Sequence, residues 1–420
     1  MGVRERERVG RHRRGFLRYG AALGAAFVGS HADPLYAQRP ENSSPTLADS
    51  TKKLGAPVGP YGERARFETA VRRQAKTPTN ESSWTFTPLE DSRGIITPSA
   101  LHFERHHGGI PILDPAKHKL MIHGLVERPL VLTVGEIHRL PAVSRIYFIE
   151  CSGNTLTEWE KPTESGVQGT HGLTSCSEWT GVPLSLLLKE AGVQNGGTWI
   201  VAEGADAAVM TRSIPLEKAM DDILLAYGQN GEALRPEQGY PLRLVIPGWE
   251  GSAQVKWVRR LKVVDKPYMT REETSKYTDL MPDGTARRFT FVMEAKSVIT
   301  TPSGDQRLPS VGFYEIRGLA WSGRGAVRRV EVSTDGGRNW SDARLEEPVL
   351  RHAHTRFCHP WRWDGRETIL QSRCTDESGY VQPTREELVK QRGLHSYYHN
   401  NAIQTWKVAA DGKITNGNRA

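Results

Sequence analysis

Cysteine is scarce in this chain, and the usual cysteine motifs are missing. Four cysteines occur among 420 residues: Cys151, Cys176, Cys358 and Cys374. No Cys-x-x-Cys-His is present, which excludes a c-type haem attached to this chain, and the paired spacing of a zinc site is absent too. In an oxidising compartment four cysteines would ordinarily form two disulfides. Cys358 and Cys374 flank a predicted hairpin, so this pair could be bridged.

The chain also lacks a long apolar run and a basic helix with interleaved aromatic residues. Its net charge of +8 comes partly from arginines near the N-terminus, so we expect no nucleic-acid binding. The apolar run from Ala21 to Val28 is about eight to ten residues long, which is too short to span a bilayer. With 37% hydrophobic and 25% charged residues, the composition indicates a globular enzyme of two domains without a membrane span.

The N-terminal residues resemble a twin-arginine export signal. The run Arg11-His12-Arg13-Arg14-Gly15-Phe16-Leu17 precedes the short apolar segment, and Leu35-Tyr36-Ala37 offers a cleavage site before Gln38. We therefore predict a removable signal peptide over residues 1–37 and a periplasmic mature chain. A basic disordered tail is the alternative. The resemblance implies export of a folded protein, often one that already holds a cofactor.

Three further segments follow the predicted signal. Residues 38–87 are polar and rich in Pro, Ser and Gly, which is typical of an extended arm. Residues 88–284 mix strand and helix patterns, such as a strand over Leu120–Gly124 and a helix over Leu184–Ala191 that Gly192 ends; a second strand is expected around Val255–Val258. Residues 285–420 alternate like short strands between Gly-rich turns. We predict an α+β chain, a mixed α/β domain followed by a β-sandwich.

One cysteine stands where a metal ligand would stand. The run Phe148-Ile149-Glu150-Cys151-Ser152-Gly153-Asn154 places it at the end of an apolar segment, where Gly and Asn bend the chain. A thiolate there would face a cavity, and it is a soft donor that suits a sulfur-loving metal. The alternative is a small buried hydrophobic residue, because one cysteine alone specifies no metal.

Segments on both sides of this cysteine resemble the sulfite oxidase family of molybdenum enzymes. Residues 101–109 match the family's Phe-x-Arg-Asn-His segment, with His106 in place of Asn, and residues 172–184 and 224–257 match two further segments. The resemblance implies a molybdopterin-binding catalytic domain over residues 88–284. It also implies that residues 285–420 form an immunoglobulin-like β-sandwich that serves for dimerisation.

The resemblance also implies a site and a cofactor, molybdenum-molybdopterin, a pyranopterin dithiolene. Cys151 would be the thiolate on the metal, and the candidate catalytic residues would be Cys151, Arg105, Tyr277 and Arg392. The cofactor would be bound by Phe103, Arg105, His107, Asp206, Gln238, Arg243 and Lys256, of which Gln238 replaces a histidine common in the family. Arg and Lys side chains suit its phosphate. The alternative reading places Arg243 and Lys256 on a solvated strand face, and Tyr277 and Arg392 on the surface.

The residues after the cysteine depart from the sulfite-oxidising pattern. Those relatives read Cys-x-Gly-Asn-Arg-Arg and hold an anionic substrate with the second arginine, where this chain has Leu156. Loss of one charged hydrogen bond costs about 1.5–3 kcal/mol, enough to weaken a small dianion about tenfold to a hundredfold. Together with residues 171–179, the motif most resembles sulfane dehydrogenase molybdenum subunits of the Sox thiosulfate-oxidising system. That implies sulfane sulfur on a carrier protein as substrate, a c-type cytochrome as electron acceptor, and a homodimer or a heterotetramer with the cytochrome.

Three other functions remain open on the sequence. A sulfite dehydrogenase that passes electrons to cytochrome c would prefer free sulfite in a steady-state assay. A reductase of the same fold would act on sulfoxides with a reduced dye. A cofactor-free binding module, such as a carbohydrate-binding sandwich protein, would contain no molybdenum after maturation.

Overall fold

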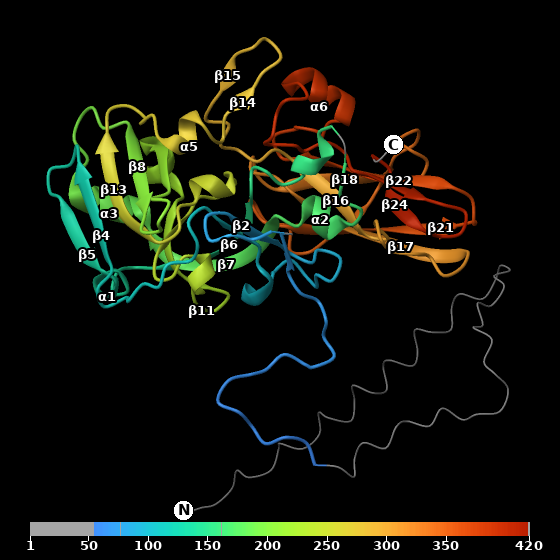
Figure 1. The fold of residues 1–420 in the computed structure, drawn as a ribbon, viewed down its shortest axis with the longest axis horizontal. Helices are drawn as coiled ribbons and strands as arrows, with labels where there is room; N and C mark the ends of the chain where they lie inside the picture. The colour runs from blue at the N-terminus through green and yellow to red at the C-terminus, as the bar shows by residue number, and fades with distance from the viewer. Residues whose placement is uncertain (1–53, 76, 161, 419–420) are drawn as a thin grey trace, which may run out of the picture. The chain divides into compact units, whose positions relative to one another are not determined.

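The computed structural model describes residues 54–75, 77–160 and 162–418, which fall into two units divided after Ala65 (Figure 1). The predicted signal peptide, residues 1–37, lies outside the described residues, as does the start of the predicted arm. Residues 54–65 contain no helix or strand. Within the described ranges, no helix combines the length and the apolar character that a membrane crossing needs.

The end of the predicted arm pairs into a sheet. The strands of this three-stranded antiparallel sheet are β1 (Arg73–Gln74), β2 (Ser83–Phe86) and β3 (Glu104–His106). Trp84 lies opposite Arg105 in the register of β2 and β3. The segment before residue 87 therefore contributes side chains next to the Phe103-x-Arg105 motif.

Two five-stranded sheets build the catalytic region. The first has the order β11-β10-β7-β6, with β12 paired to β10, and consists of β6 (Val143–Glu150), β7 (Thr174–Pro183), β10 (Leu224–Gln229), β11 (Glu232–Ala233) and β12 (Arg243–Val245). The second has the order β5-β4-β13-β8-β9 and consists of β4 (Lys119–Gly124), β5 (Leu130–Thr133), β8 (Trp199–Gly204), β9 (Thr211–Pro215) and β13 (Val258–Val264). Only β4 and β13 run parallel among these pairs.

Short helices connect these strands: α1 (Val134–Ile137), α2 (Val167–His171), α3 (Leu184–Ala191), α4 (Leu216–Asp221) and α5 (Arg271–Thr274). Helix α1 begins at a capping box in which Thr133 and Glu136 satisfy each other's backbone N–H groups. Helix α3 buries Leu184, Leu187 and Leu188 in the core and ends at Gly192, whose φ of 67° is left-handed. Helix α3 and its end at Gly192 were predicted at these positions.

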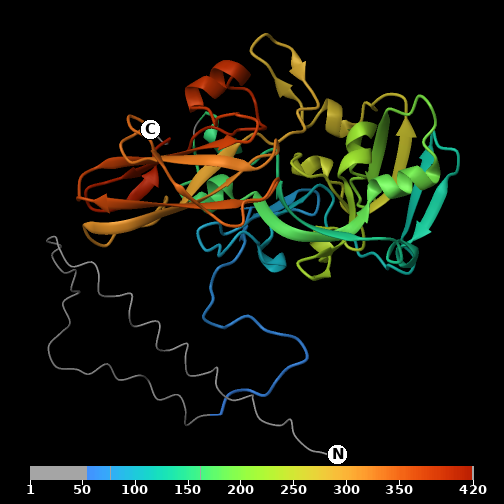
Figure 2. The same ribbon diagram turned by 180° about the vertical axis from the view of Figure 1, so that it is seen from behind.

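The C-terminal residues form the predicted sandwich of two antiparallel sheets. One has the order β16-β17-β21-β20: β16 (Lys296–Thr301), β17 (Gly312–Trp321), β20 (Arg344–Glu346) and β21 (Thr355–Trp363). The other has the order β19-β18-β22-β23-β24: β18 (Val327–Ser333), β19 (Ser341–Asp342), β22 (Thr368–Asp376), β23 (Thr405–Val408) and β24 (Ile414–Asn416). Helix α6 (Arg385–Arg392) follows β22, and a small hairpin of β14 (Asp279–Leu280) and β15 (Ala286–Arg287) precedes the sandwich (Figures 1 and 2). The predicted α+β class is confirmed.

Two local predictions were wrong. Cys358 and Cys374 do not flank a hairpin, because their strands β21 and β22 pair into different sheets, and all four cysteines are free. The second strand expected around Val255 begins only at Val258; Lys256 makes a single bridge to Arg243. This bridge brings Arg243 and Lys256 next to each other.

Candidate active site

Cys151 follows directly after strand β6 and is held there by backbone pairing. Its N–H donates to the carbonyl of Leu173 at 2.9 Å, and its carbonyl accepts from the N–H of Asn154 at 2.8 Å. The Asn154 side chain accepts from Leu173 N at 3.1 Å and donates to Glu150 Oε1 at 2.9 Å. The Asn154 side-chain amide therefore links the predicted Gly-Asn turn to Glu150 at the end of β6 and to Leu173 just before β7. These two hydrogen bonds fix the position of the thiol.

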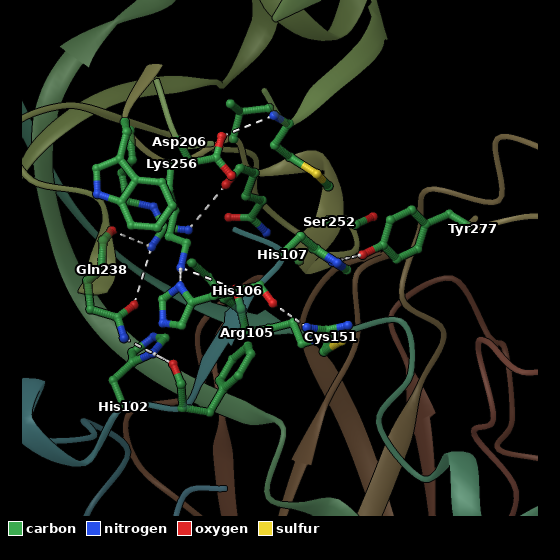
Figure 3. Close-up of a pocket in the computed structure, with 18 residues that line it drawn as sticks. His102, Arg105, His106, His107, Cys151, Asp206, Gln238, Ser252, Lys256 and Tyr277 are labelled. Atoms are coloured by element: carbon green, nitrogen blue, oxygen red, sulfur yellow. Dashed lines mark hydrogen bonds between the residues drawn. The ribbon is translucent and has the colours of Figure 1, made fainter. Parts of the chain in front are cut away.

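The thiol lines a cavity with about 670 Å³ of empty space, part of it open to solvent. Burial raises the pKa of the Cys151 thiol, and the nearby Arg105 cation lowers it in part. Figure 3 shows Cys151 beside Arg105 in this cavity. The cavity brings together nine of the predicted site residues: Phe103, Arg105, His107, Cys151, Asp206, Gln238, Arg243, Lys256 and Tyr277.

Among the residues that the structure describes, two cations of this cavity, the buried Arg243 and the partly buried Lys256, have no carboxylate partner within ion-pair distance. Arg243 donates to the carbonyl of Gln238 at 2.9 Å and lies 4.8 Å from the ring of Trp179. Lys256 donates to the carbonyl of Glu237 at 2.9 Å and to that of Arg105 at 3.3 Å. Burial lowers the pKa of both groups, that of Lys256 to about 7. A solvated strand face, the alternative reading for these residues, is wrong.

Three histidines of the 102–107 segment line the same cavity and are neutral. His106 stands between Glu104 Oε2, at 2.7 Å, and Lys256 Nζ, at 2.9 Å, so the ammonium donates to Nδ1 and Nε2–H donates to the carboxylate. Burial lowers the pKa of His106 to about 4 and that of His102 to about 3. His102 Nε2 is buried without a hydrogen-bond partner.

These features fit a large anionic, hydrogen-bonding cofactor held by one thiolate. A buried cation is costly unless an anion or phosphate compensates it, and a buried nitrogen without a partner needs an acceptor or donor. Arg243 and Lys256 would hold phosphate, His102 Nε2 would meet the pterin edge, and Cys151 would bind the metal. Asp206 and Gln238 are buried on the same wall, where Gln238 Nε2 donates to the Phe103 carbonyl at 3.0 Å. No group of three or more His, Cys, Asp or Glu side chains in the described part of the chain could hold a metal.

A tyrosine lies across the cavity from Gln238 and Lys256 (Figure 3). Tyr277 has a left-handed φ of 47°, and its hydroxyl lies 2.8 Å from His107 Nε2; the two side chains point toward each other in Figure 3. Burial raises the pKa of the Tyr277 phenol and lowers that of His107 to about 3, so the hydrogen bond joins two neutral groups. Beneath the ring, the Arg212 guanidinium lies 5.1 Å from its centroid.

Arg212 is a site residue that sequence reasoning missed. It is buried, donates to Glu250 Oε1 at 2.7 Å and to the Ser252 hydroxyl, and lies 3.6 Å from Glu273. Burial raises the pKa of Glu250, but the charges and hydrogen bonds of Arg212 and His399 together lower it to about 2. No local pattern around Arg212 signals this role, since its partners lie 38 to 61 positions further along the chain.

A wider outer cavity opens next to Cys151. It encloses about 2460 Å³ of empty space, part of it open to solvent, and is lined by Arg105, His107, Cys151 and Tyr277 together with Trp84, Leu156, Lys276 and Tyr397. Leu156 is 43% exposed and Tyr397 is 64% exposed. The position where sulfite-oxidising relatives carry an arginine thus presents an apolar side chain to the entrance.

Arg392, the fourth predicted catalytic residue, lies apart from the other three. Arg392 is the last residue of α6, is buried, and lies 3.5 Å from Asp279 Oδ2 on β14. It lines neither of the cavities that contain Cys151. Its guanidinium pairs with the Asp279 carboxylate on β14 instead of facing either cavity.

Comparison with known proteins agrees with this geometry. Residues 107–272 match the family model of the oxidoreductase molybdopterin binding domain, and residues 287–406 match that of the Mo-co oxidoreductase dimerisation domain. The chain is 34% identical to nitrate reductase [NADH] of Ulva prolifera over 83% of its length, and 31% identical to mitochondrial sulfite oxidase of Mus musculus over 77%. It spans only 42% and 63% of those two proteins.

A solved structure matches over nearly its whole length. The crystal structure of the sulfane dehydrogenase SoxCD from Paracoccus pantotrophus has a TM-score of 0.86 and 50% sequence identity, and the match covers 88% of this chain and 97% of that chain. The matches are to molybdopterin enzymes. They agree with the cavity that contains Cys151, Arg243 and Lys256, and with the β-sandwich that follows the catalytic region. The chain belongs to the sulfite oxidase family of molybdopterin oxidoreductases, whose cofactor is molybdenum-molybdopterin.

Proposed function

We propose that this protein oxidises sulfane sulfur carried on the cysteine of a partner protein and passes the electrons to a c-type cytochrome. The observation that carries the proposal is the exposed Leu156 at the outer cavity, which offers a free sulfite dianion no cation at that position, while Arg105, Arg271 and Lys276 line the rest of the cavity. The outer cavity is wide enough to admit a polypeptide-borne group. The match to a protein titled sulfane dehydrogenase, at 50% identity, supports the same substrate class.

The chain's own residues fit this chemistry. When bound, the molybdenum cofactor supplies an oxygen atom and accepts two electrons. Arg105 lines both cavities, where its guanidinium can hold an oxyanion that develops on the substrate sulfur. When His107 Nε2–H donates to the Tyr277 oxygen, the phenolic proton stays free to donate into the cavity. The Arg212 guanidinium packs against the Tyr277 ring, and Glu250 holds Arg212 in place.

Free sulfite is the second candidate, favoured by the 31% identity to mitochondrial sulfite oxidase. A steady-state assay with cytochrome c as acceptor separates the two, because it compares carrier-bound sulfane with free sulfite on the same molybdenum-loaded enzyme. We expect kcat/KM to be higher for the carrier-bound substrate. A high kcat/KM for sulfite alone, or turnover of nitrate with reduced dye, would overturn the proposal.

The Leu156→Arg variant sharpens this test. It returns a charged donor to the entrance, so we expect kcat/KM for free sulfite to rise about tenfold to a hundredfold. The matched control is Leu156→Met, which keeps the apolar entrance and should leave the sulfite rate unchanged. If Leu156→Arg gains nothing over Leu156→Met, the entrance does not determine the substrate.

The location and the assembly of the protein belong to the same proposal. The run Arg11–Leu17 supports export by the twin-arginine route to the periplasm, where the carrier protein and the cytochrome would be met. The dimerisation domain over residues 287–406 supports a homodimer, or a heterotetramer with the cytochrome. Replacing Arg13 and Arg14 by lysine should leave the protein in the cytoplasmic fraction, whereas unchanged periplasmic activity would refute the export route.

A further inference from the structure

The loop that carries Cys151 is held at both ends by one side chain of the sandwich. Lys296, the first residue of β16, donates from Nζ to Glu150 Oε1 at 2.7 Å and to Thr155 Oγ1 at 3.2 Å. Glu150 directly precedes the cysteine, and Thr155 directly follows the Gly153-Asn154 turn. The Lys296 ammonium therefore links Glu150, just before the cysteine, to Thr155, at the end of the loop.

The Glu150 carboxylate is fully enclosed by donors. Its Oε1 accepts from Lys296 and from Asn154 Nδ2, and its Oε2 accepts from Trp321 Nε1 at 2.6 Å. Lys296 and Trp321 lie opposite each other in the register of β16 and β17, so one cross-strand pair of the sandwich presents both donors. Glu150 and Lys296 are each no more than 1% exposed.

Other parts of the C-terminal region complete the support. The N–H of His399 donates to the carbonyl of Ser152 at 2.8 Å, and Thr155 Oγ1 lies 2.6 Å from the carbonyl of Asn400. Thr155 itself has a left-handed φ of 66°, a conformation that a non-glycine residue keeps only when its surroundings hold it. The catalytic cysteine is thus placed by residues from both halves of the chain.

We propose that Lys296 and Trp321 are positioning residues for the molybdenum thiolate, acting through Glu150 and Thr155 on the torsion of Cys151. The orientation of a ligand is commonly set by hydrogen bonds behind it, and losing these typically costs about 10–100-fold in metal affinity or activity. The sandwich is then part of the active-site scaffold in addition to its dimerisation role. The proposal requires the family's cofactor but does not depend on which sulfur compound is the substrate.

The main test uses the double variant Glu150→Gln/Lys296→Met in the molybdenum-loaded enzyme. It removes both buried charges together, since removing only one would leave the other uncompensated. We expect a folded enzyme that holds molybdenum, whose paramagnetic resonance signal after one-electron chemical reduction is shifted or split, and whose kcat per molybdenum falls about 10–100-fold. The control is Glu331→Gln/Arg373→Met, which removes a different ion pair, a carboxylate and a guanidinium between β18 and β22.

Trp321→Phe provides the second variant should the double variant fail to fold. It removes one neutral donor and keeps both charges, so the resonance signal should shift in the same direction by a smaller amount. A wild-type signal in Trp321→Phe overturns the proposal, as does a double variant that loses thermal stability while its signal and its kcat per molybdenum stay unchanged. The resonance measurement needs no substrate, so it stays decisive even if the sulfane proposal fails.

Discussion

Raising the pH should stabilise the cofactor-free protein through Lys256. Its ammonium is partly buried beside the Arg243 cation, and the attraction of Glu104, Asp206 and Glu237 only partly offsets the desolvation, so its pKa in the folded state is about 7. In the unfolded chain the pKa of a lysine is about 10.4. Between these two values the unfolded chain holds a proton that the folded chain has released, and the free energy of unfolding therefore increases with pH.

The size of the effect follows from the two pKa values. One proton of difference changes the free energy of unfolding by about 1.4 kcal/mol per pH unit, which gives at most about 4 kcal/mol between pH 7 and pH 10. Below pH 7 both states carry the charge, and the burial penalty is present in full. A bound phosphate would restore the charged form of Lys256, so the cofactor-loaded protein should lack this increase.

Urea unfolding at pH 7, 8, 9 and 10 tests the prediction on the cofactor-free protein and on Lys256→Met. Cysteines and other groups titrate in both proteins, so the difference between the two isolates Lys256. We expect the variant's advantage in unfolding free energy to shrink steadily from pH 7 to pH 10. A difference that stays constant over this range would show that Lys256 keeps its proton, and the argument for an uncompensated buried cation would fail.

The remaining predictions concern single side chains. Cys151→Ala should fold normally by circular dichroism but lose activity, and full activity would refute the ligand role. Tyr277→Phe should lower kcat about tenfold, because it removes the hydroxyl bonded to His107 while the ring stays over Arg212; an unchanged kcat would exclude a role for the hydroxyl. Arg392→Met should lower the melting temperature and leave KM unchanged, because Arg392 pairs with Asp279 outside both cavities. A tenfold rise in KM would return it to the substrate pocket.

Much of the site could be read from residue order because its residues cluster in short segments. The Phe103-x-Arg105 segment and the Cys151 turn each place several functional groups within a few positions, and the alternation of β22 and the cap of α3 follow local rules. Arg212 and Lys296 had no such signal. Each acts on partners at least 38 positions away, and their sequence surroundings resemble those of ordinary strand residues.

From the residues alone we could predict several strands, the helix over Leu184–Ala191, and the cysteine with its apolar neighbour Leu156, and we could expect an export signal. Which charged side chains pair with one another depends on the tertiary structure. Within the described ranges it leaves Arg243 and Lys256 without a paired carboxylate, pairs Arg392 with Asp279, and places Lys296 against the cysteine loop. The physical reason is that strand and turn preferences are set by nearest neighbours along the chain. Whether a buried charge is compensated depends on groups that only the packing of two sheets brings within hydrogen-bond distance.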